Sequence, residues 1–523
     1  MLRAAVWGVM VMAVLAVIGM VSESIGFITE SSDQGLRSRV FRLVLLGFAN
    51  LAFLSFLALS AGLYFWARVA RSLPDLQGWH LQKPSSEFSA SEISEQYSLD
   101  DYFAQEERVF DELEQLACSD WADEFTGAYN RFDSSSVCHP LETATRNWNR
   151  SHCLQAKRPI GGVLLLHGLS DSPYSMRAIG ERLHAEGYTV VWLRIPGHGT
   201  CPRALAEVSW QDWAAAVQVA VKGLRDLVPE GLPLILAGYS NGGALSLNYV
   251  LSAIEDSSLP SIESVLLFSP MIGVNPLARM THLYHAVGLI SRNEKAKWSS
   301  VFAEIDPYKY SSWPMNANVQ AWRLTKVVER KLAALEKAQK LDRLPAVLAM
   351  QSVVDATVVV PKLITLLFDR LSTTSSELVL FDVNRMERLS NLLNLSFEST
   401  VKPRLAREGR SYRLSVLRNQ SGESNRVALF VRQQGSWREF AVDGVWPHGV
   451  VSLSHVAVPF SPSDPVYGES NLEHRYSLGA ISMRAEPSAL MIPSSLFVRC
   501  RHNPFYDFME DHLIEWLQSQ ASD

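Results

Sequence analysis

The sequence lacks the signatures by which several large classes of protein are recognised. It has no P-loop, no G-x-G-x-x-G motif and no repeat of fixed period, so nothing in it supports a nucleotide-binding or repeat protein. The five cysteines are scattered and contain no zinc-type pair, which removes the usual sequence evidence for a metal site. A formal net charge of -6 gives no reason to expect nucleic acid as a partner.

Charged residues are absent from two long stretches near the N-terminus, residues 4–22 and 43–67. The second has 25 residues, and a helix of that length spans roughly 37 Å, enough for a ~30 Å hydrocarbon core. Tyr64 and Trp66 stand near its end, where amphipathic rings favour the membrane interface. We therefore expect residues 1–70 to be a membrane anchor with two transmembrane helices, held in a bilayer.

Each stretch has an alternative interpretation. The first follows Arg3 and could be a signal peptide, although its apolar run is long and "MVSES" is a poor cleavage site. The second could be a buried helix of a soluble domain.

We expect the protein in a bacterial inner (plasma) membrane. Basic residues in the connecting loop and in the outer flanks nearly balance, so the side that holds the remaining chain stays open.

The remaining sequence divides at about residue 157. Residues 71–157 are predicted to be a linker and a helical N-terminal elaboration, with its helix at "LDDYFAQEERVFDELEQLA". In residues 158–523, short apolar runs such as "GVLLL", "TVVWL" and "SVLLF" alternate with amphipathic helical stretches. Continuous apolar runs of this length indicate parallel strands covered on both faces. The predicted fold class is α/β, with a doubly wound, mostly parallel sheet.

Two insertions interrupt this alternation. Residues 272–344 are rich in aromatic side chains and are predicted to form a cap over the sheet, with core packing as the explanation for most of those side chains. Residues 388–449 contain "YRLSVLRN", "RVALFVRQ" and "WREFAV", which predict a β-rich insertion. Insertions at the carboxyl ends of strands overhang the ligand crevice of such a sheet.

One serine lies between glycines where an apolar strand turns into a helix. Gly238-Tyr239-Ser240-Asn241-Gly242 matches G-x-S-x-G, the pattern in which a strained strand-to-helix turn exposes a nucleophilic serine. The turn is so tight that small residues are needed two positions before and two after the serine. The alternative is an ordinary glycine-rich turn, but the flanking strand and helix favour a nucleophile.

A second turn supplies a candidate oxyanion hole. In "LLLHGLSDSP" a strand ends at His167-Gly168, which places the backbone N–H of Leu169 where a developing oxyanion would lie, with the N–H of Asn241 as the second donor. His167 itself could be a histidine satisfied within the turn. The two roles are compatible because the oxyanion hole uses the backbone.

Together these motifs resemble the serine α/β-hydrolases, especially the branch of monoacylglycerol lipases, lysophospholipases and carboxylesterases. The resemblance covers about residues 160–275 and 340–385, and its most specific parts are "HGLSDSPYSMRAIGERLHAEGYTVVWLRIPGHGT" and "GYSNGG". It implies an α/β-hydrolase fold and a triad in the chain order serine, acid, histidine. The N-terminal apolar stretches and the insertion at 388–449 lie outside the common pattern.

The resemblance implies that the triad acid is Asp355, which follows the fifth predicted strand in "AVLAMQSVVDATVVVPK". Its rival is Asp382, after the next strand, in the place where the family usually carries its histidine.

The position of the base departs from the family pattern, because "ELVLFDVNRMERL" has no histidine. We prefer His455, at the end of the strand-like run "GVVSLSHVAVPF", with His502 as the alternative base. The other histidines of this region are His448, His474 and His512.

These residues predict a serine carboxylic ester hydrolase that needs no cofactor or metal. Its substrates are expected to be lipid-like esters, such as lysophospholipids or monoacylglycerols, because an anchor would hold the site near the bilayer. One alternative is a thioesterase or acyltransferase that uses the same serine. Another is a non-catalytic hydrolase-fold module tethered to the membrane, which only the unusual histidine position favours.

Overall fold

The computed structural model describes residues 36–125, 128–273, 293–355, 357–385, 401–403, 411–433, 436–448, 450–469, 476–479 and 500–522. The chain divides into two units, Met1–Leu73 and Pro74–Asp523. From Pro74 onward, the predicted N-terminal elaboration and the α/β domain therefore lie in one unit.

A ten-stranded sheet forms the centre of the second unit, with the strand order β1-β3-β2-β4-β5-β8-β9-β10-β11-β12. The strands from β3 to β10 in this order are parallel, while β1, β11 and β12 pair antiparallel with their neighbours. The bounds of the strands are β1 His152–Leu154, β2 Gly162–Leu166, β3 Thr189–Leu193, β4 Leu234–Tyr239, β5 Ser264–Phe268, β8 Ala346–Ser352, β9 Glu377–Phe381, β10 Arg413–Asn419, β11 Arg426–Gln433 and β12 Ser436–Val445.

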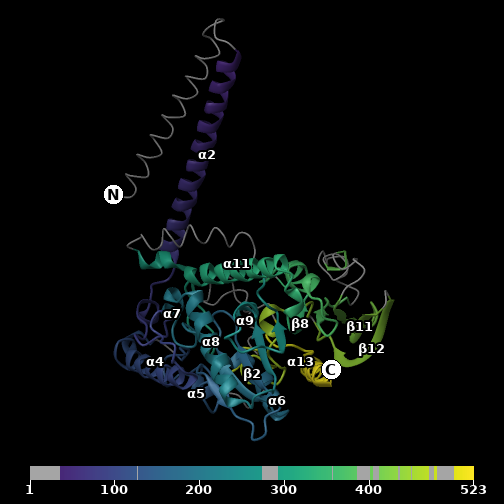
Figure 1. Cartoon of the computed structure of the whole chain (residues 1–523). Helices are drawn as coiled ribbons and strands as arrows, with labels where there is room; N and C mark the ends of the chain where they lie inside the picture. Colours follow the sequence, from purple (N-terminus) through teal and green to yellow (C-terminus); the bar gives the residue numbers. More distant parts are fainter. Residues whose placement is uncertain are drawn as a thin grey trace. The chain divides into compact units, whose positions relative to one another are not determined.

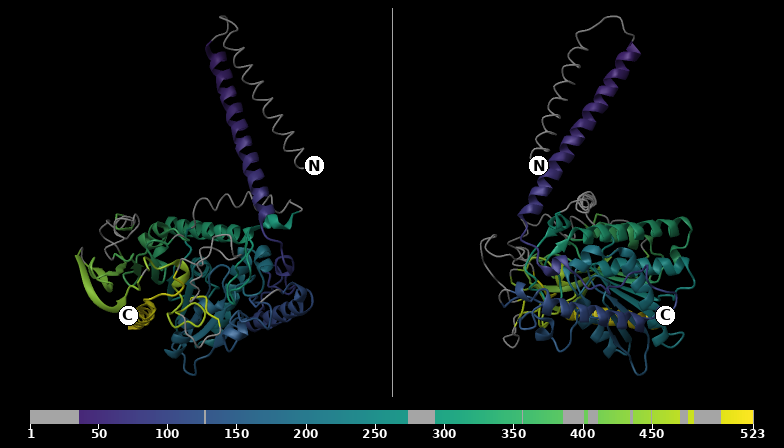
Figure 2. Two further views of the ribbon diagram at one scale, coloured as in Figure 1. Left: turned by 180° about the vertical axis from the view of Figure 1, so that it is seen from behind. Right: turned by 90° about the vertical axis from the view of Figure 1, so that its left-hand side faces the viewer.

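Helices cover both faces of this sheet (Figure 1). On one face α8 and α9 pack on β2, β3 and β4, and α11 lies against α9; on the other face α6 and α13 contact strands of the sheet. Figure 2 gives the same layers from two further directions. The principal helices are α2 Leu36–Ser72, α3 Gly78–Leu81, α4 Leu99–Ser119, α5 Pro140–Thr143, α6 Arg177–Ala185, α7 Pro202–Glu207, α8 Trp210–Leu227, α9 Asn241–Glu255, α11 Met315–Lys337, α12 Val360–Lys362 and α13 Tyr506–Ser522.

The two faces of the strands explain why their sequences are almost entirely apolar, with polar residues such as Thr189, Ser264 and Glu377 at the first position of a strand. In β2, Leu164 and Leu166 belong to the core under α8 and α9, whereas Val163 and Leu165 belong to the core on the α6 side. All residues of β2, β3, β4, β5 and β9 are buried. Parallel strands covered on both faces leave no solvent face for polar side chains, so the predicted mostly parallel α/β sheet is confirmed.

The insertion at 388–449, predicted to be β-rich, contributes strands to the central sheet. Its three predicted strands appear as β10, β11 and β12, and β10 pairs in parallel with β9, from Arg413–Glu377 to Leu417–Phe381. The insertion therefore extends the central sheet. Edge pairing satisfies the backbone N–H and C=O groups that β9 would otherwise expose, which favours this arrangement.

In the cap insertion, residues 274–292 lie outside the described residues. The rest contains a small antiparallel pair, β6 Trp298–Ser300 and β7 Trp313–Pro314, followed by α11. Trp298, Tyr308 and Tyr310 are buried, and the Tyr308 ring stacks on Tyr174 with centroids 3.8 Å apart. Core packing is therefore the structural role of these three aromatic side chains.

The first apolar stretch, residues 4–22, lies outside the described residues, and the second falls within α2. None of the helices that the structure describes combines the length and hydropathy required for a membrane span. The five cysteines are all free thiols.

Candidate active site

Ser240 lies at the turn between β4 and α9, with strained backbone angles. Its φ of 52° and ψ of -111° are unusual for a residue with a side chain. The turn is held on both sides, because the Ser240 N–H donates to Phe268 O at 2.9 Å and Ser240 O accepts from Met271 N at 2.9 Å. Its position before the first turn of α9 also places the side chain where the helix dipole favours negative charge.

The glycines around Ser240 are required by close backbone approaches. A Cβ on Gly242 would lie 2.0 Å from Leu166 O, and one on Gly238 would lie 2.4 Å from the Gly242 carbonyl carbon. Both obstacles are backbone atoms, which cannot move aside as a side-chain end can. Gly242 is therefore needed where the elbow meets the end of β2, and Gly238 is needed where the elbow folds back on Gly242.

A continuous hydrogen-bonded path joins the three predicted triad side chains. His455 Nε2 lies 3.0 Å from Ser240 Oγ, and His455 Nδ1 lies 2.6 Å from Asp355 Oδ2. The carboxylate accepts from Nδ1–H, which leaves Nε2 free to accept the serine proton. The side chains of His455 and Asp355 are buried, so solvent does not compete for these bonds.

Four donors orient Asp355. Besides His455, Gln351 Nε2 donates to Oδ2 at 2.9 Å, and the Thr357 and Val358 N–H groups donate to Oδ1 at 2.8 and 3.0 Å. Burial by itself raises the pKa of Asp355, but the neighbouring His455 and these hydrogen bonds lower the pKa below its ordinary value. The acid is therefore ionised wherever the histidine works as a base.

The sequence suggested that His455 stands at the end of a strand, and this prediction is wrong. His455 opens a short 3₁₀ turn, His455–Ala457, and no strand occurs in the described residues 450–469. Tyr239, beside the nucleophile, donates its hydroxyl to His455 O at 3.2 Å. A loop anchored to the end of β4 thus presents the base, so no strand is needed.

The two proposed oxyanion donors are the N–H of Leu169, in the turn after β2, and the N–H of Asn241, the residue after Ser240. Neither the Leu169 nor the Asn241 N–H has an acceptor among the described residues. His167 Nε2 accepts from Ile195 N at 3.0 Å, and its Nδ1–H then donates to Gly168 O at 2.9 Å. Burial lowers the pKa of His167 well below its ordinary value. His167 is thus a neutral buried histidine that holds the turn through its own hydrogen bonds, as the sequence analysis considered.

Asp171 follows Leu169 in the same turn and carries a carboxylate. Its side chain is buried, and Lys309 Nζ lies 3.9 Å from Oδ2. Burial raises the pKa of Asp171 to about 6. A Cβ on Gly168 would lie 2.9 Å from the Tyr239 ring and 3.2 Å from Asp171 Oδ2, so Gly168 is needed for the turn to close over Tyr239.

The alternative acid and base have other partners. The buried Asp382 carboxylate pairs with Arg385. His502 Nε2 lies 3.7 Å from Glu469, His512 pairs with Glu377 at 3.2 Å, and His448 is exposed. His474 lies outside the described residues. Of the described histidines in this region, only His455 is bonded to Ser240.

Sequence reasoning missed Gln351, Tyr239 and the loop after β3 as parts of this site. Gln351 lies four residues before Asp355, and Tyr239 stands inside the elbow motif. Their closeness to the predicted site residues could be seen in the sequence, but their hydrogen bonds to Asp355 and His455 could not. In the described part of the chain, no group of three or more His, Cys, Asp or Glu side chains is placed to hold a metal ion.

Residues 157–381, less than half of the chain, match a family model described as serine aminopeptidase, S33. A thermostable monoacylglycerol lipase of Bacillus sp. (strain H-257) is 37% identical over 86 residues, which are 16% of this chain and 33% of the relative. Phospholipase YtpA of Bacillus subtilis (strain 168) is 29% identical over 121 residues, 23% of this chain and 44% of the relative. The chain thus spans less than half the length of the curated relatives it matches.

Similar solved structures include one described for the metagenome-derived lipolytic enzymes LipS and LipT, with 22% identity, a TM-score of 0.35 and coverage of 45% of this chain and 87% of that one. The monoacylglycerol lipase of Paleococcus ferrophilus has 18% identity, a TM-score of 0.33 and coverage of 44% and 88%. The fold assignment rests on the sheet topology given above.

The sheet topology and the elbow at Ser240 correspond to an α/β-hydrolase fold, and residues 157–381 match the family model given above. The resemblance to the serine α/β-hydrolases is confirmed, with residues 157–381 as the matching segment.

Proposed function

We propose that this protein is a membrane-anchored serine hydrolase that cleaves carboxylic esters through an acyl-Ser240 intermediate. The observation that carries the proposal is the path from Ser240 Oγ through His455 to Asp355, with spacings of 3.0 and 2.6 Å. In this reaction His455 takes the Ser240 proton as Oγ attacks the ester carbonyl, and Asp355 stabilises the imidazolium.

The remaining steps follow from the same groups. The Leu169 and Asn241 N–H groups donate to the tetrahedral oxyanion, and His455 returns its proton to the leaving alcohol. Water, deprotonated by His455, then attacks the acyl-enzyme and releases the carboxylic acid. Protein groups and water suffice for each step.

The proposed substrates are lipid-like esters of the lysophospholipid or monoacylglycerol type. Two lines support this class: the curated relatives are a monoacylglycerol lipase and a phospholipase, and α2 exposes large apolar side chains, among them Phe48, Leu51 and Leu54. Contiguous exposed apolar surface favours contact with lipid or with another apolar surface.

The proposed anchor rests on the sequence, since none of the described helices qualifies as a span. Residues 4–22 and 43–67 carry no charge, and a bilayer is the environment that such stretches favour. We propose a location in a bacterial inner membrane. Extraction of a membrane fraction with alkaline carbonate tests this: the anchored protein stays in the pellet, and release of the full chain into the supernatant would contradict the proposal.

Labelling by a fluorophosphonate probe tests the chemistry. The wild-type protein is expected to be labelled and Ser240→Ala to remain unlabelled, although both give the same circular dichroism and melting temperature. Labelling that persists in Ser240→Ala, or its absence from folded wild-type protein, would exclude Ser240 as the nucleophile.

A substrate panel then separates the ester hypothesis from its rivals. Monoacylglycerols and lysophospholipids in mixed micelles are compared with acyl-CoA thioesters and with aminoacyl arylamides, the last chosen because the matching family model is described as an aminopeptidase. Turnover of the lipid esters at a kcat/KM at least tenfold above the other classes is expected. A preference for thioesters would favour the thioesterase alternative.

A further inference from the structure

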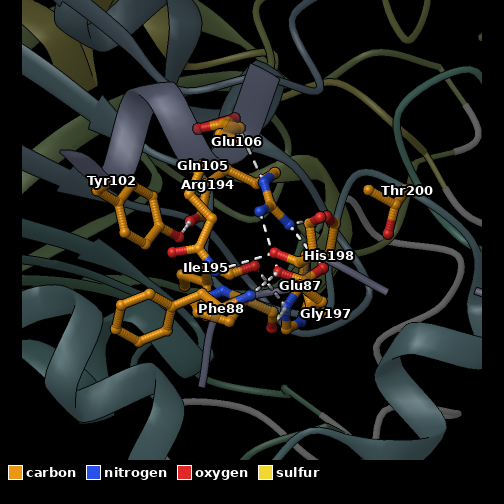
Figure 3. Close-up of polar contacts among 12 residues, drawn as sticks. Glu87, Phe88, Tyr102, Gln105, Glu106, Arg194, Ile195, Gly197, His198 and Thr200 are labelled. Carbon is orange, nitrogen blue, oxygen red and sulfur yellow. Dashed lines mark hydrogen bonds and ion pairs between the residues drawn. The ribbon is translucent and has the colours of Figure 1, made fainter. Parts of the chain in front are cut away.

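Arg194 is the centre of a buried charge cluster that includes two glutamates of the N-terminal elaboration (Figure 3). Arg194 follows β3 directly and is 1% exposed. Its Nη1 and Nη2 donate to the two carboxylate oxygens of Glu87, each at 3.0 Å, and its Nε lies 3.3 Å from Glu106 Oε1. Glu87 and Glu106 both precede the segment that matches the hydrolase family.

Further bonds fix the backbone of this loop. The Tyr102 hydroxyl donates to Arg194 O at 2.6 Å, and the Arg194 N–H donates to Ser151 Oγ at 2.8 Å. Arg194 Nη1 also donates to His198 O at 3.1 Å. The guanidinium thus bonds within its own loop, to His198 O, and also to the two glutamates of the N-terminal elaboration, as the dashed lines of Figure 3 show.

From Arg194 a chain of three bonded groups leads to the oxyanion hole. Ile195, the next residue, donates its N–H to His167 Nε2 at 3.0 Å, and His167 Nδ1–H donates to Gly168 O at 2.9 Å. The Gly168 carbonyl belongs to the same planar peptide unit as the Leu169 N–H. Because the two groups of a trans peptide point in opposite directions, fixing Gly168 O also aims the Leu169 N–H.

We propose that Glu87 and Glu106, through Arg194, are positioning residues for the oxyanion hole. The inference rests on the proposed function, and it adds that part of the catalytic geometry is supplied by the N-terminal elaboration. Neither glutamate touches the substrate. They hold Arg194 and hence Ile195, whose N–H selects the His167 tautomer that orients the Leu169 donor.

The charges are suited to this task in a way that apolar packing is not. Burial alone would lower the pKa of Arg194, but Glu87 and the other neighbours raise it above its ordinary value, so the guanidinium stays charged. A bidentate guanidinium–carboxylate pair fixes orientation as well as distance. Removal of one partner leaves a buried charge poorly compensated, and the loop is expected to shift to solvate it.

The decisive variant is Glu87→Gln in the full-length protein, which keeps the shape of the side chain and removes its charge. Loss of a whole oxyanion donor costs about 10²–10³ in kcat. We therefore expect a misaimed donor to lower kcat about 10- to 100-fold on p-nitrophenyl butyrate, with KM within about twofold of wild type. The acid limb of the pH–rate profile should stay unchanged, because the His455–Asp355 pair is untouched.

Glu377→Gln is the matched control. Glu377, on β9, likewise has a buried carboxylate, which holds His512 at 3.2 Å and Arg413 at 3.4 Å. None of these partners, nor Ser415, which also bonds to Glu377, belongs to the loop after β3. This variant should lose thermal stability comparable to that lost by Glu87→Gln while kcat stays within about twofold of wild type.

Tyr102→Phe decides the question by the same criteria if Glu87→Gln does not fold, since it removes only the hydroxyl that holds Arg194 O. The inference is overturned if kcat is unchanged, if the loss appears in KM, or if Glu377→Gln loses kcat to the same extent. Wild-type protein without Ser240-dependent turnover would instead refute the proposed function, and the inference with it.

Discussion

Replacement of Asp355 by asparagine is the sharpest test of the site, because the surrounding donors dictate how the new amide must lie. Oδ1 accepts from the Thr357 and Val358 N–H groups, so the oxygen of the introduced amide has to occupy that position. The amide NH₂ then takes the place of Oδ2, where it faces His455 Nδ1. In Asp355→Asn, His455 must therefore accept at Nδ1 and carry its proton on Nε2.

That tautomer cannot take the proton of Ser240. In serine hydrolases the equivalent change lowers kcat by about 10⁴, which corresponds to about 5 kcal/mol of transition-state stabilisation. Here Gln351 Nε2 also donates to Oδ2 at 2.9 Å. The introduced NH₂ would therefore face a second N–H donor, which is unfavourable. We expect a loss of kcat of about 10⁴ together with a lower melting temperature.

The assay compares kcat on p-nitrophenyl butyrate and the rate of fluorophosphonate labelling between wild type, Asp355→Asn and Asp382→Asn. Asp382 is a buried carboxylate that pairs with Arg385, so its variant should lose stability and keep kcat within about threefold. A folded Asp355→Asn protein that retains more than about a tenth of wild-type kcat would refute the assignment of the acid.

Three further outcomes follow from the structure. Gly242→Ala places a Cβ 2.0 Å from Leu166 O, so it should abolish fluorophosphonate labelling and lower the free energy of unfolding by about 3 kcal/mol or more. The control Gly422→Ala has open space around the new Cβ and should change neither quantity. Burial lowers the pKa of His198 to about 4 from 6.5, so the unfolded chain binds this proton more tightly than the folded one. Stability should therefore fall by up to roughly 3 kcal/mol as the pH drops from about 6.5 to 4, and urea titrations of wild type and His198→Gln should show a smaller dependence in the variant. Tyr239→Phe removes the bond to His455 O and should lower kcat about 2- to 10-fold with unchanged KM; an altered KM alone would argue against a role in holding the base.

Local signals in the sequence were sufficient for the elbow and for the sheet. The strained turn at Ser240 requires glycines within two residues of it, and that requirement is visible in five consecutive letters. The strands are likewise visible, because a strand buried on both faces has few polar positions. What these signals share is that each depends on residues close together in the chain.

The base was harder to place because its position depends on contacts distant in sequence. His455 is 100 residues from Asp355 and 215 from Ser240, and β10, β11 and β12 enter the sheet between the acid and the base. A strand ending in histidine was the natural interpretation of "GVVSLSHVAVPF", yet the bond from Tyr239 to His455 O holds the loop without a strand. No periodicity in the sequence indicates such a bond.

The charges of the Arg194 cluster were also impossible to place from the sequence, because their burial depends on contacts distant in the chain. Glu87 stands in a polar, serine-rich linker and Glu106 in an acidic helix, and on composition both would be assigned to solvated surface. Their burial follows only from the packing of that segment over the end of β3, where Arg194 is the counter-charge. If the segment aims the Leu169 donor as proposed, residues outside the family match belong to the catalytic unit, and a variant trimmed to residues 157–381 would lack them. The boundary of the recognisable family would then differ from the boundary of the working enzyme.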